Sequence, residues 1–359
     1  MDLEVQVPLS DAIPVHWEWF QGLLTVTFIC HLLFISTALG LMIIASVNSL
    51  TKANGTATAI SRDAAYRLPF IIAFAINLGV PPLLFFSVIW GHVGYVSTVL
   101  MAAWWVSVVA LLIIAYYGAY VFKFRFDALG KAKAALIVGT TLIFLFVAFL
   151  FSNNFTLAQR MDAWVEYFDS PAGGLLNLSD PTLWPRYLHF IVASIAQGGL
   201  FVALVWSGKK KQGEADALQK VTFGLRWFFW ATIAQVIVGS WFLASQPGHI
   251  IKLFMGKDLL ATALMLCVVF LVPLMLVLAK KQKVIATTVV LVSVVSVMAV
   301  CRELLRRGAL GDAVLPDKLS VTGEYSPMVF FAVSFVVGAV VIIYLLRLLN
   351  KAATDGGEQ

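Results

Sequence analysis

The sequence predicts an all-α protein that crosses a membrane nine times. Of its 359 residues, 61% are apolar and only 12% are charged, whereas soluble domains carry about 25% charged residues. The chain also contains 27 Phe and 11 Trp. Its apolar runs approach the length of about 20 residues that a helix needs to cross the ~30 Å hydrocarbon layer. This composition excludes a soluble nucleic-acid-binding protein, a collagen-like chain and a small disulfide-rich scaffold.

Short breaks separate the apolar runs, and most carry a residue type that favours the membrane interface: proline, an aromatic residue or a basic residue. In chain order the predicted spans are 20–48, which follows Trp17 and Trp19; 68–90, which begins at Pro69 and ends at Trp90; 97–122, which follows Tyr95; 134–152, which follows Lys133; 185–207, which begins at Pro185; 222–245, which precedes Pro247; 258–279, which precedes Lys280; 284–305, which follows Lys283; and 327–347, which begins at Pro327.

The distribution of charge predicts the orientation. When the connections are assigned alternately to the two sides, most of the 25 basic residues fall on one side and most of the 19 acidic residues on the other. The positive-inside rule then places the N-terminus outside and the C-terminus in the cytoplasm. We therefore expect one membrane domain over residues 1–359, in a multi-pass protein of the bacterial cytoplasmic (inner) membrane. The longest connections, 153–184 and 308–326, both fall on the outer side.

Ionisable side chains inside a bilayer are functional candidates because burying them there is costly. His31, His189 and Glu303 lie within predicted spans, all in the outer half of the membrane. Met265 should lie at a depth similar to that of His189, and a His/Met pair is a known axial ligand set for haem iron. A buried histidine can equally be hydrogen-bonded to a neighbouring helix and bind nothing.

A stripe of small residues after His189 also has two readings. Ala193, Ala196 and Gly199 recur at helical spacing, so they could leave room for a flat macrocycle between helices. Small residues also permit close packing of membrane helices. The sequence leaves both interpretations open.

Four segments resemble subunit I of the cytochrome bd quinol oxidases, and the resemblance extends over almost the whole membrane part. These segments are FICHLLFISTALGLMI (28–43), PRYLHFIVASIAQGGLF (185–201), LLATALMLCVVF (259–270) and CRELLRRG (301–308). The resemblance implies that His189 and Met265 ligate a low-spin haem b. It further implies that His31 and Glu303 each ligate a high-spin haem of b or d type, with Arg306 nearby.

The chain also departs from that family. The family's long hydrophilic loop, which is associated with quinol oxidation, is replaced by the short connection SQPGHIIKLFMGKD (245–258). The family's third helix carries two carboxylates for proton delivery, but here no Asp or Glu occurs between Asp63 and Asp127. The family's Gly-Arg-Gln-Pro-Trp motif is reduced to Arg306, Arg307 and Gly308.

The leading hypothesis is a haem-binding membrane cytochrome b of the bd-oxidase superfamily. It would relay electrons between the quinone pool and a partner, either a second membrane subunit or an outer-side c-type cytochrome, with quinone or quinol as a further ligand. One alternative is a terminal quinol oxidase that reduces O₂ to water. Another is a haem-free channel, transporter or assembly subunit on the same scaffold, for which Pro81, Pro82 and Pro273 would be helix interruptions. Arg302, Arg306 and Arg307 fit haem propionates or lipid headgroups equally well.

Overall fold

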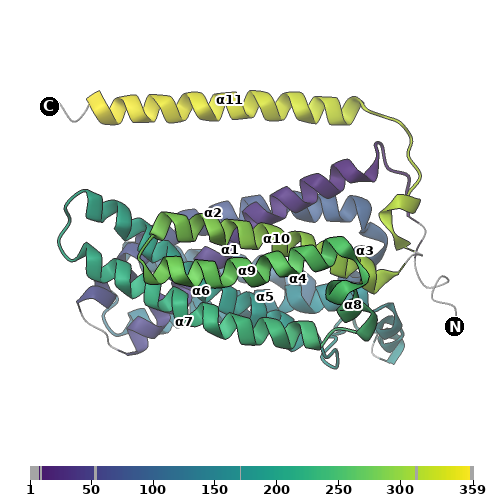
Figure 1. The fold of residues 1–359 in the computed structure, drawn as a ribbon, viewed down its shortest axis with the longest axis horizontal. Coiled ribbons are helices and arrows are strands. Elements are labelled where there is room, and N and C mark those ends of the chain that lie inside the picture. Colours follow the sequence, from purple (N-terminus) through teal and green to yellow (C-terminus); the bar gives the residue numbers. More distant parts are fainter. Residues whose placement is uncertain (1–7, 9, 52–54, 170, 312–313, 356–359) are drawn as a thin grey trace.

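The computed structural model describes residues 8, 10–51, 55–169, 171–311 and 314–355. The described chain is a bundle of long helices that run roughly along one axis (Figure 1). The helices are α1 (Trp17–Leu50), α2 (Thr56–Ile89), α3 (Gly91–Leu100), α4 (Ala102–Phe124), α5 (Ala132–Gln159), α6 (Leu183–Lys211), α7 (Ala217–Ala244), α8 (Gly248–Lys252), α9 (Leu259–Lys280), α10 (Val284–Leu310) and α11 (Ser326–Asp355).

The predicted fold class is confirmed. Within the described residues, nine helices are long and apolar enough to span a membrane: α1, α2, α4, α5, α6, α7, α9, α10 and α11. Each corresponds to one predicted span. Three shorter helical turns lie in connections: η2 (Met161–Asp169), the π-helical η3 (Leu253–Lys257) and η5 (Pro316–Lys318).

The structure differs from the predicted bounds at the start of the second span, and it divides the third span in two. The second span begins at Thr56 rather than 68, so Pro69 lies inside α2, as do Pro81 and Pro82. Helices within membranes tolerate proline because neighbouring groups can pair with the backbone atoms that it frees. The prolines of α2, like Pro273 of α9, therefore do not interrupt their helices as the transporter alternative had assumed.

The third predicted span, 97–122, is divided at Met101 into α3 and α4. The connection between α5 and α6 pairs with the backbone on both sides of the break. Ala103 N donates to Gly173 O at 2.9 Å, and Leu175 N donates to Leu100 O at 3.1 Å. Because these groups find partners outside their own helix, the chain can end α3 without leaving buried polar atoms unpaired.

The bundle is packed around α1, whose residues from Thr37 onward are largely buried. One apolar cluster combines α1 with α2, α4, α5, α6 and α7. Gly199 of α6 packs directly against α7: a Cβ at this position would lie 2.8 Å from Gly224 O and 2.7 Å from Phe228 N. At Gly199, therefore, the small-residue stripe serves close helix packing.

The segments that precede α1 and α11 lie side by side. Ile13 N donates to Ser320 O at 2.8 Å, and Thr322 N donates to Ile13 O at 2.9 Å. The helices α1 and α11 therefore begin at the same end of the molecule, as an odd number of spans requires. In Figure 1, α11 runs along the bundle but stands apart from it, and its Phe331 ring meets Phe85 of α2 edge-on at 6.4 Å.

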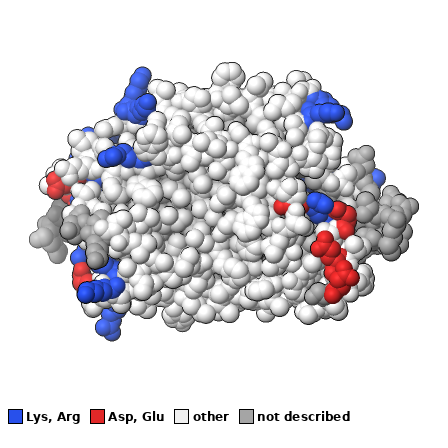
Figure 2. All heavy atoms as spheres, turned by 90° about the horizontal axis from the view of Figure 1, so that it is seen from below, with Lys and Arg blue, Asp and Glu red and all other residues white. Residues whose placement is uncertain are grey.

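Charged side chains gather at the two ends of the bundle. Figure 2 shows Lys, Arg, Asp and Glu near the ends of the face in view, with a broad uncharged belt between them. The membrane-length helices carry large apolar side chains that are more than half exposed, such as Val106, Phe270 and Phe335. A surface of this kind fits contact with lipid tails.

Candidate functional site

His31 lies on α1 and faces α2. Its Nδ1 atom is 2.8 Å from the backbone oxygen of Ala75. Because a carbonyl oxygen only accepts, Nδ1 carries the hydrogen, and Nε2 of the neutral ring keeps its lone pair. Gly79 makes room for the ring, since a Cβ at this position would lie 2.9 Å from both Cε1 and Nδ1 of His31.

His189 lies on α6 and faces α7. Its Nδ1 atom is 2.9 Å from Nε2 of Gln235, whereas Oε1 of Gln235 is buried without a hydrogen-bond partner. Turning the amide of Gln235 by 180° exchanges the positions of its oxygen and its nitrogen, and the choice between the two orientations is made from the hydrogen bonds around the amide. In the turned orientation, Nδ1–H of His189 donates to Gln235 Oε1, and the lone pair of Nε2 is left available.

His189 and Met265 are linked through the surroundings of Phe242. The ring of His189 lies 5.8 Å from that of Phe242 on α7. Phe242 and Met265 both pack against a small apolar cluster that includes Cys301 and Leu305 of α10. Met265 and the phenylalanine that contacts His189 therefore pack against one shared cluster.

Glu303 and Arg306 form an ion pair on α10, with Arg306 Nη1 donating to Glu303 Oε2 at 2.5 Å. Both residues are buried; the side chain of Arg306 is 3% exposed and that of Glu303 is 11% exposed. The second carboxylate oxygen, Oε1, is buried without a partner. One carboxylate oxygen therefore remains able to accept a hydrogen bond or to bind a metal.

Several arginines crowd around this ion pair. Arg186 of α6 is 5% exposed, and Arg186 and Arg302 each lie close enough to Arg306 for mutual repulsion. Arg186 Nη2 donates to Gln159 Oε1 at 3.1 Å, but its Nε is buried without a partner. Other unpartnered buried atoms of the region are Trp90 Nε1 and Arg307 Nη2.

Aromatic rings contribute to the stability of these guanidinium groups. Arg302 lies 4.3 Å above the Phe28 ring, and Arg306 lies 5.0 Å above that of Phe86. Cation–π contacts of this kind stabilise a buried cation but do not neutralise it. Since Glu303 is the acid paired with Arg306, the region retains excess positive charge and favours an anionic group.

The predicted site residues are found in two neighbourhoods. His189 contacts Phe242, which packs against the same apolar cluster as Met265, while Glu303 and Arg306 are bonded to each other. His31 lies in neither, but Phe28, one turn before it on α1, contacts Arg302 beside Glu303. Arg186 lies one turn before His189, with its guanidinium 5.1 Å from the Phe242 ring.

Sequence reasoning missed Arg186 and Gln235. Both are polar residues inside predicted spans, which was the criterion that selected the histidines. Arg186 even lies within the quoted segment 185–201, three residues before His189. Gln235 could not be matched to His189 because the two residues are 46 positions apart and meet only when α6 packs on α7.

The residues present fit a haem. His31 has Nδ1 bonded to a carbonyl oxygen, which leaves the Nε2 lone pair for iron, and His189 has the same tautomer in the orientation of Gln235 that presents Oε1. Met265 supplies a soft thioether, and Glu303 retains an unpartnered oxygen. The excess of buried arginine complements propionate groups, because guanidinium pairs well with carboxylate.

Comparison with known proteins gives one kind of match. No family model matches the chain, and no curated protein sequence matches it. A chain in the structure of bd oxidase from Geobacillus thermodenitrificans is similar, with a TM-score of 0.65 at 12% sequence identity. The match covers 92% of this chain and 98% of that chain. The predicted resemblance to a bd oxidase subunit is therefore confirmed for the fold.

Proposed function

We propose that this chain is a haem-binding membrane cytochrome b that relays electrons between the quinone pool and a partner redox protein. It acts as one membrane unit in the bacterial cytoplasmic membrane, with its N-terminus outside. The partner is a second membrane subunit or an outer-side c-type cytochrome. The similarity of the fold to that of a bd oxidase chain supports this proposal.

The observation that carries the proposal is the hydrogen bonding of the two intramembrane histidines. His31 is anchored to a backbone carbonyl of α2, and His189 to a side-chain amide of α7. Histidines that bind metals almost always use their second nitrogen in this way, since the outer partner fixes the tautomer and the ring orientation.

His189 and Met265 would hold a low-spin haem b, and His31 and Glu303 would each hold a high-spin haem of b or d type. A haem with two protein ligands has no open position and supplies one-electron transfer, whereas a haem with one protein ligand keeps a face for O₂. Arg186, Arg302 and Arg306 would pair with propionates. Through these contacts the arginines would orient the macrocycle and favour the more negatively charged, reduced state.

The relay is favoured over complete oxygen reduction because the chain lacks acidic residues between Asp63 and Asp127. The connection between α7 and α9 is also short, since it consists of α8 and η3. A quinol-oxidising loop would therefore have to come from a partner, or quinone would have to bind elsewhere on the chain.

Reduced-minus-oxidised absorption spectra of the purified protein test the proposal. We expect a low-spin b-type band that His189→Ala abolishes, because the iron would lose one of its two axial ligands. His16→Ala is the matched control, since His16 is an exposed histidine of the same predicted membrane side.

A purified, folded protein without any haem band would contradict the proposal and favour the haem-free alternative. Met265→Leu provides a second check that conserves volume and apolarity. We expect it to retain haem but to convert the low-spin band to a high-spin spectrum. Should both variants keep the wild-type spectrum, the assignment of the axial ligands is wrong.

A further inference from the structure

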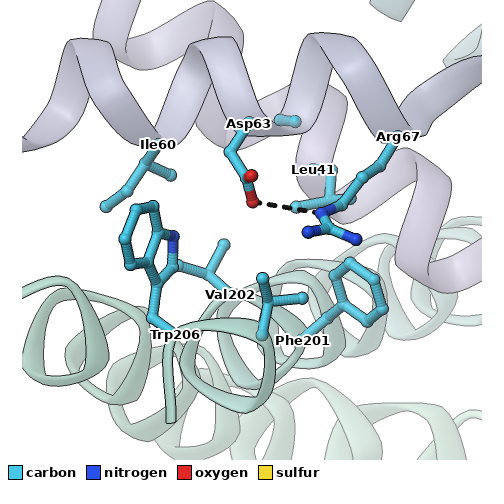
Figure 3. A pocket seen from close by; sticks show the side chains of 9 residues that line it. Leu41, Ile60, Asp63, Arg67, Phe201, Val202 and Trp206 are labelled. Atoms are coloured by element: carbon cyan, nitrogen blue, oxygen red, sulfur yellow. Dashed lines mark hydrogen bonds and ion pairs between the residues drawn. The ribbon is translucent and has the colours of Figure 1, made fainter. Parts of the chain in front are cut away.

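A second polar site lies at the opposite end of the bundle from the buried arginines. A pocket there is bounded by α1, α2 and α6 (Figure 3). Its apolar wall is formed by Leu41, Ile60, Phe201 and Val202. Its rim carries Asp63, Arg67 and Trp206, with the two charged residues on α2 facing the tryptophan on α6.

Positive charge exceeds negative charge around this pocket. Asp63 accepts from Arg67 Nε at 3.1 Å and from Lys209 Nζ at 3.3 Å. Lys209 Nζ also lies 3.9 Å from the Trp206 ring centroid, and Lys220 Nζ lies 3.7 Å from it. In the described part of the chain, Asp63 thus pairs with two cations, and Lys220, which lies over the same tryptophan ring as Lys209, forms no salt bridge.

Arg67 uses only part of its hydrogen-bonding capacity. Its Nε is bonded to Asp63, while its two terminal nitrogens form no side-chain hydrogen bond within the described residues. The side chain is 35% exposed, and Figure 3 shows the terminal nitrogens turned over the pocket toward Phe201. Asp63 therefore holds the guanidinium in place with its forked end free to bind an oxyanion.

The position of the pocket matches the level of lipid headgroups. Asp63 lies two turns into α2, and Lys209 lies in the last turn of α6. This is the end of the bundle that the positive-inside rule assigns to the cytoplasm. Anionic headgroups bind to basic pockets between membrane helices on that side.

We propose that the charged rim of this pocket binds the phosphate of an anionic phospholipid from the inner leaflet. Arg67 and Lys209 bind the phosphate oxygens, and Trp206 positions Lys209 and Lys220. A neutral quinone ring fits less well, because it would leave the excess positive charge uncompensated. The proposal does not depend on haem binding, since the pocket and the haem-site residues lie at opposite ends of the bundle.

Native mass spectrometry of the delipidated protein, re-equilibrated with phosphatidylglycerol and phosphatidylethanolamine in equal amounts, tests the proposal. We expect the wild-type protein to retain phosphatidylglycerol preferentially. Each of Arg67→Gln and Lys209→Gln should reduce that retention about five-fold, since each removes one headgroup-facing charge. Lys281→Gln is the matched control, because it removes an exposed charge on the same side outside the pocket.

Three outcomes would overturn the proposal: equal retention of both lipids by the wild-type protein, equal losses in Lys281→Gln, or displacement of the adduct by inorganic phosphate alone. A bound species with the mass of a quinone would also overturn it. Arg67→Lys distinguishes binding from folding, because it keeps the charge but not the fork. We expect Arg67→Lys to retain more phosphatidylglycerol than Arg67→Gln does.

Discussion

At the scale of single residues, the most informative contact joins His189 to Gln235. The histidine alone is ambiguous, because a buried imidazole can be a ligand or a packing residue. Its partner is a buried amide that can present either a donor or an acceptor to Nδ1. When the oxygen is presented, the amide fixes the tautomer in which Nε2 is free to bind a metal. In that orientation the pair has the hydrogen bonding expected of a ligand and its support.

Replacing Gln235 should weaken haem binding without removing the ligand. We expect Gln235→Leu to lower haem affinity about 10- to 100-fold, the usual cost of losing the partner of a metal-binding histidine. Titration of the apoprotein with haem, followed in the Soret region, measures this change. Gln21→Leu is the control, because Gln21 is another glutamine with a buried unpartnered Oε1. Equal affinities of Gln235→Leu and the wild-type protein would show that the amide does not support a ligand.

At the scale of elements, helical spacing explains how polar groups share one face. Arg186 and His189 are three residues apart on α6, as are Glu303 and Arg306 on α10. Side chains at this spacing project from the same side of a helix. Each helix therefore presents one arginine beside one candidate ligand, which is the arrangement that an anionic macrocycle would need.

Ion pairs of Arg160 stabilise the start of the short helix η2. Arg160 Nε and Nη2 donate to Asp162 at 2.9 and 2.7 Å, and Arg160 Nη1 donates to Asp180 at 3.2 Å. These hydrogen bonds hold the pKa of Asp162 below its ordinary value. Because Asp162 is more than half exposed, its pair with Arg160 contributes no more than about 1 kcal/mol.

Since the pKa of Asp162 is lower in the folded than in the unfolded chain, its contribution to stability is complete above pH ~4 and is lost as the pH falls through the folded value. We expect Asp162→Asn to lower the Tm at pH 7 and the difference to disappear near pH 2. Thermal unfolding in detergent measures both values. Glu166→Gln, an exposed change on the same helix, should have no such effect. A difference that persists unchanged in acid would contradict the explanation.

At the scale of the whole molecule, the uncharged belt and the charged ends define a membrane protein, but they do not say which end faces the cytoplasm. The contact between the segments before α1 and α11 places both helix starts at one end. The excess of Lys and Arg at the other end is what predicts N-out, C-in. The lipid pocket would then open to the inner leaflet.

Accessibility of single cysteines tests this orientation. In a background without Cys30, Cys267 and Cys301, we expect a membrane-impermeant maleimide to label Glu324→Cys from outside the cell membrane. Lys281→Cys should react only after permeabilisation, because it lies at the basic end. Both positions are exposed in the structure, so burial cannot explain a difference. The reverse labelling pattern would invert the topology.

The residues of the candidate site could be chosen from the sequence, but their arrangement could not. His31, His189, Met265 and Glu303 could be chosen from the sequence because polar groups are costly in a lipid interior and therefore rare there. The resemblance of four segments to a bd oxidase subunit then gave these residues roles. Their mutual placement could not be obtained in this way, because it depends on which faces of α6, α7, α9 and α10 meet.

The sequence by itself determined the number of spans, the class of the fold and the ends that carry charge, because transfer of apolar residues into lipid is a local property of each run. Only the tertiary structure decided that α2 continues through Pro69, that Met101 separates α3 from α4, and that Gln235 and Arg186 adjoin the haem-site candidates. Those features depend on hydrogen bonds and charges between residues far apart in the chain, and such pairings leave no periodic pattern along it.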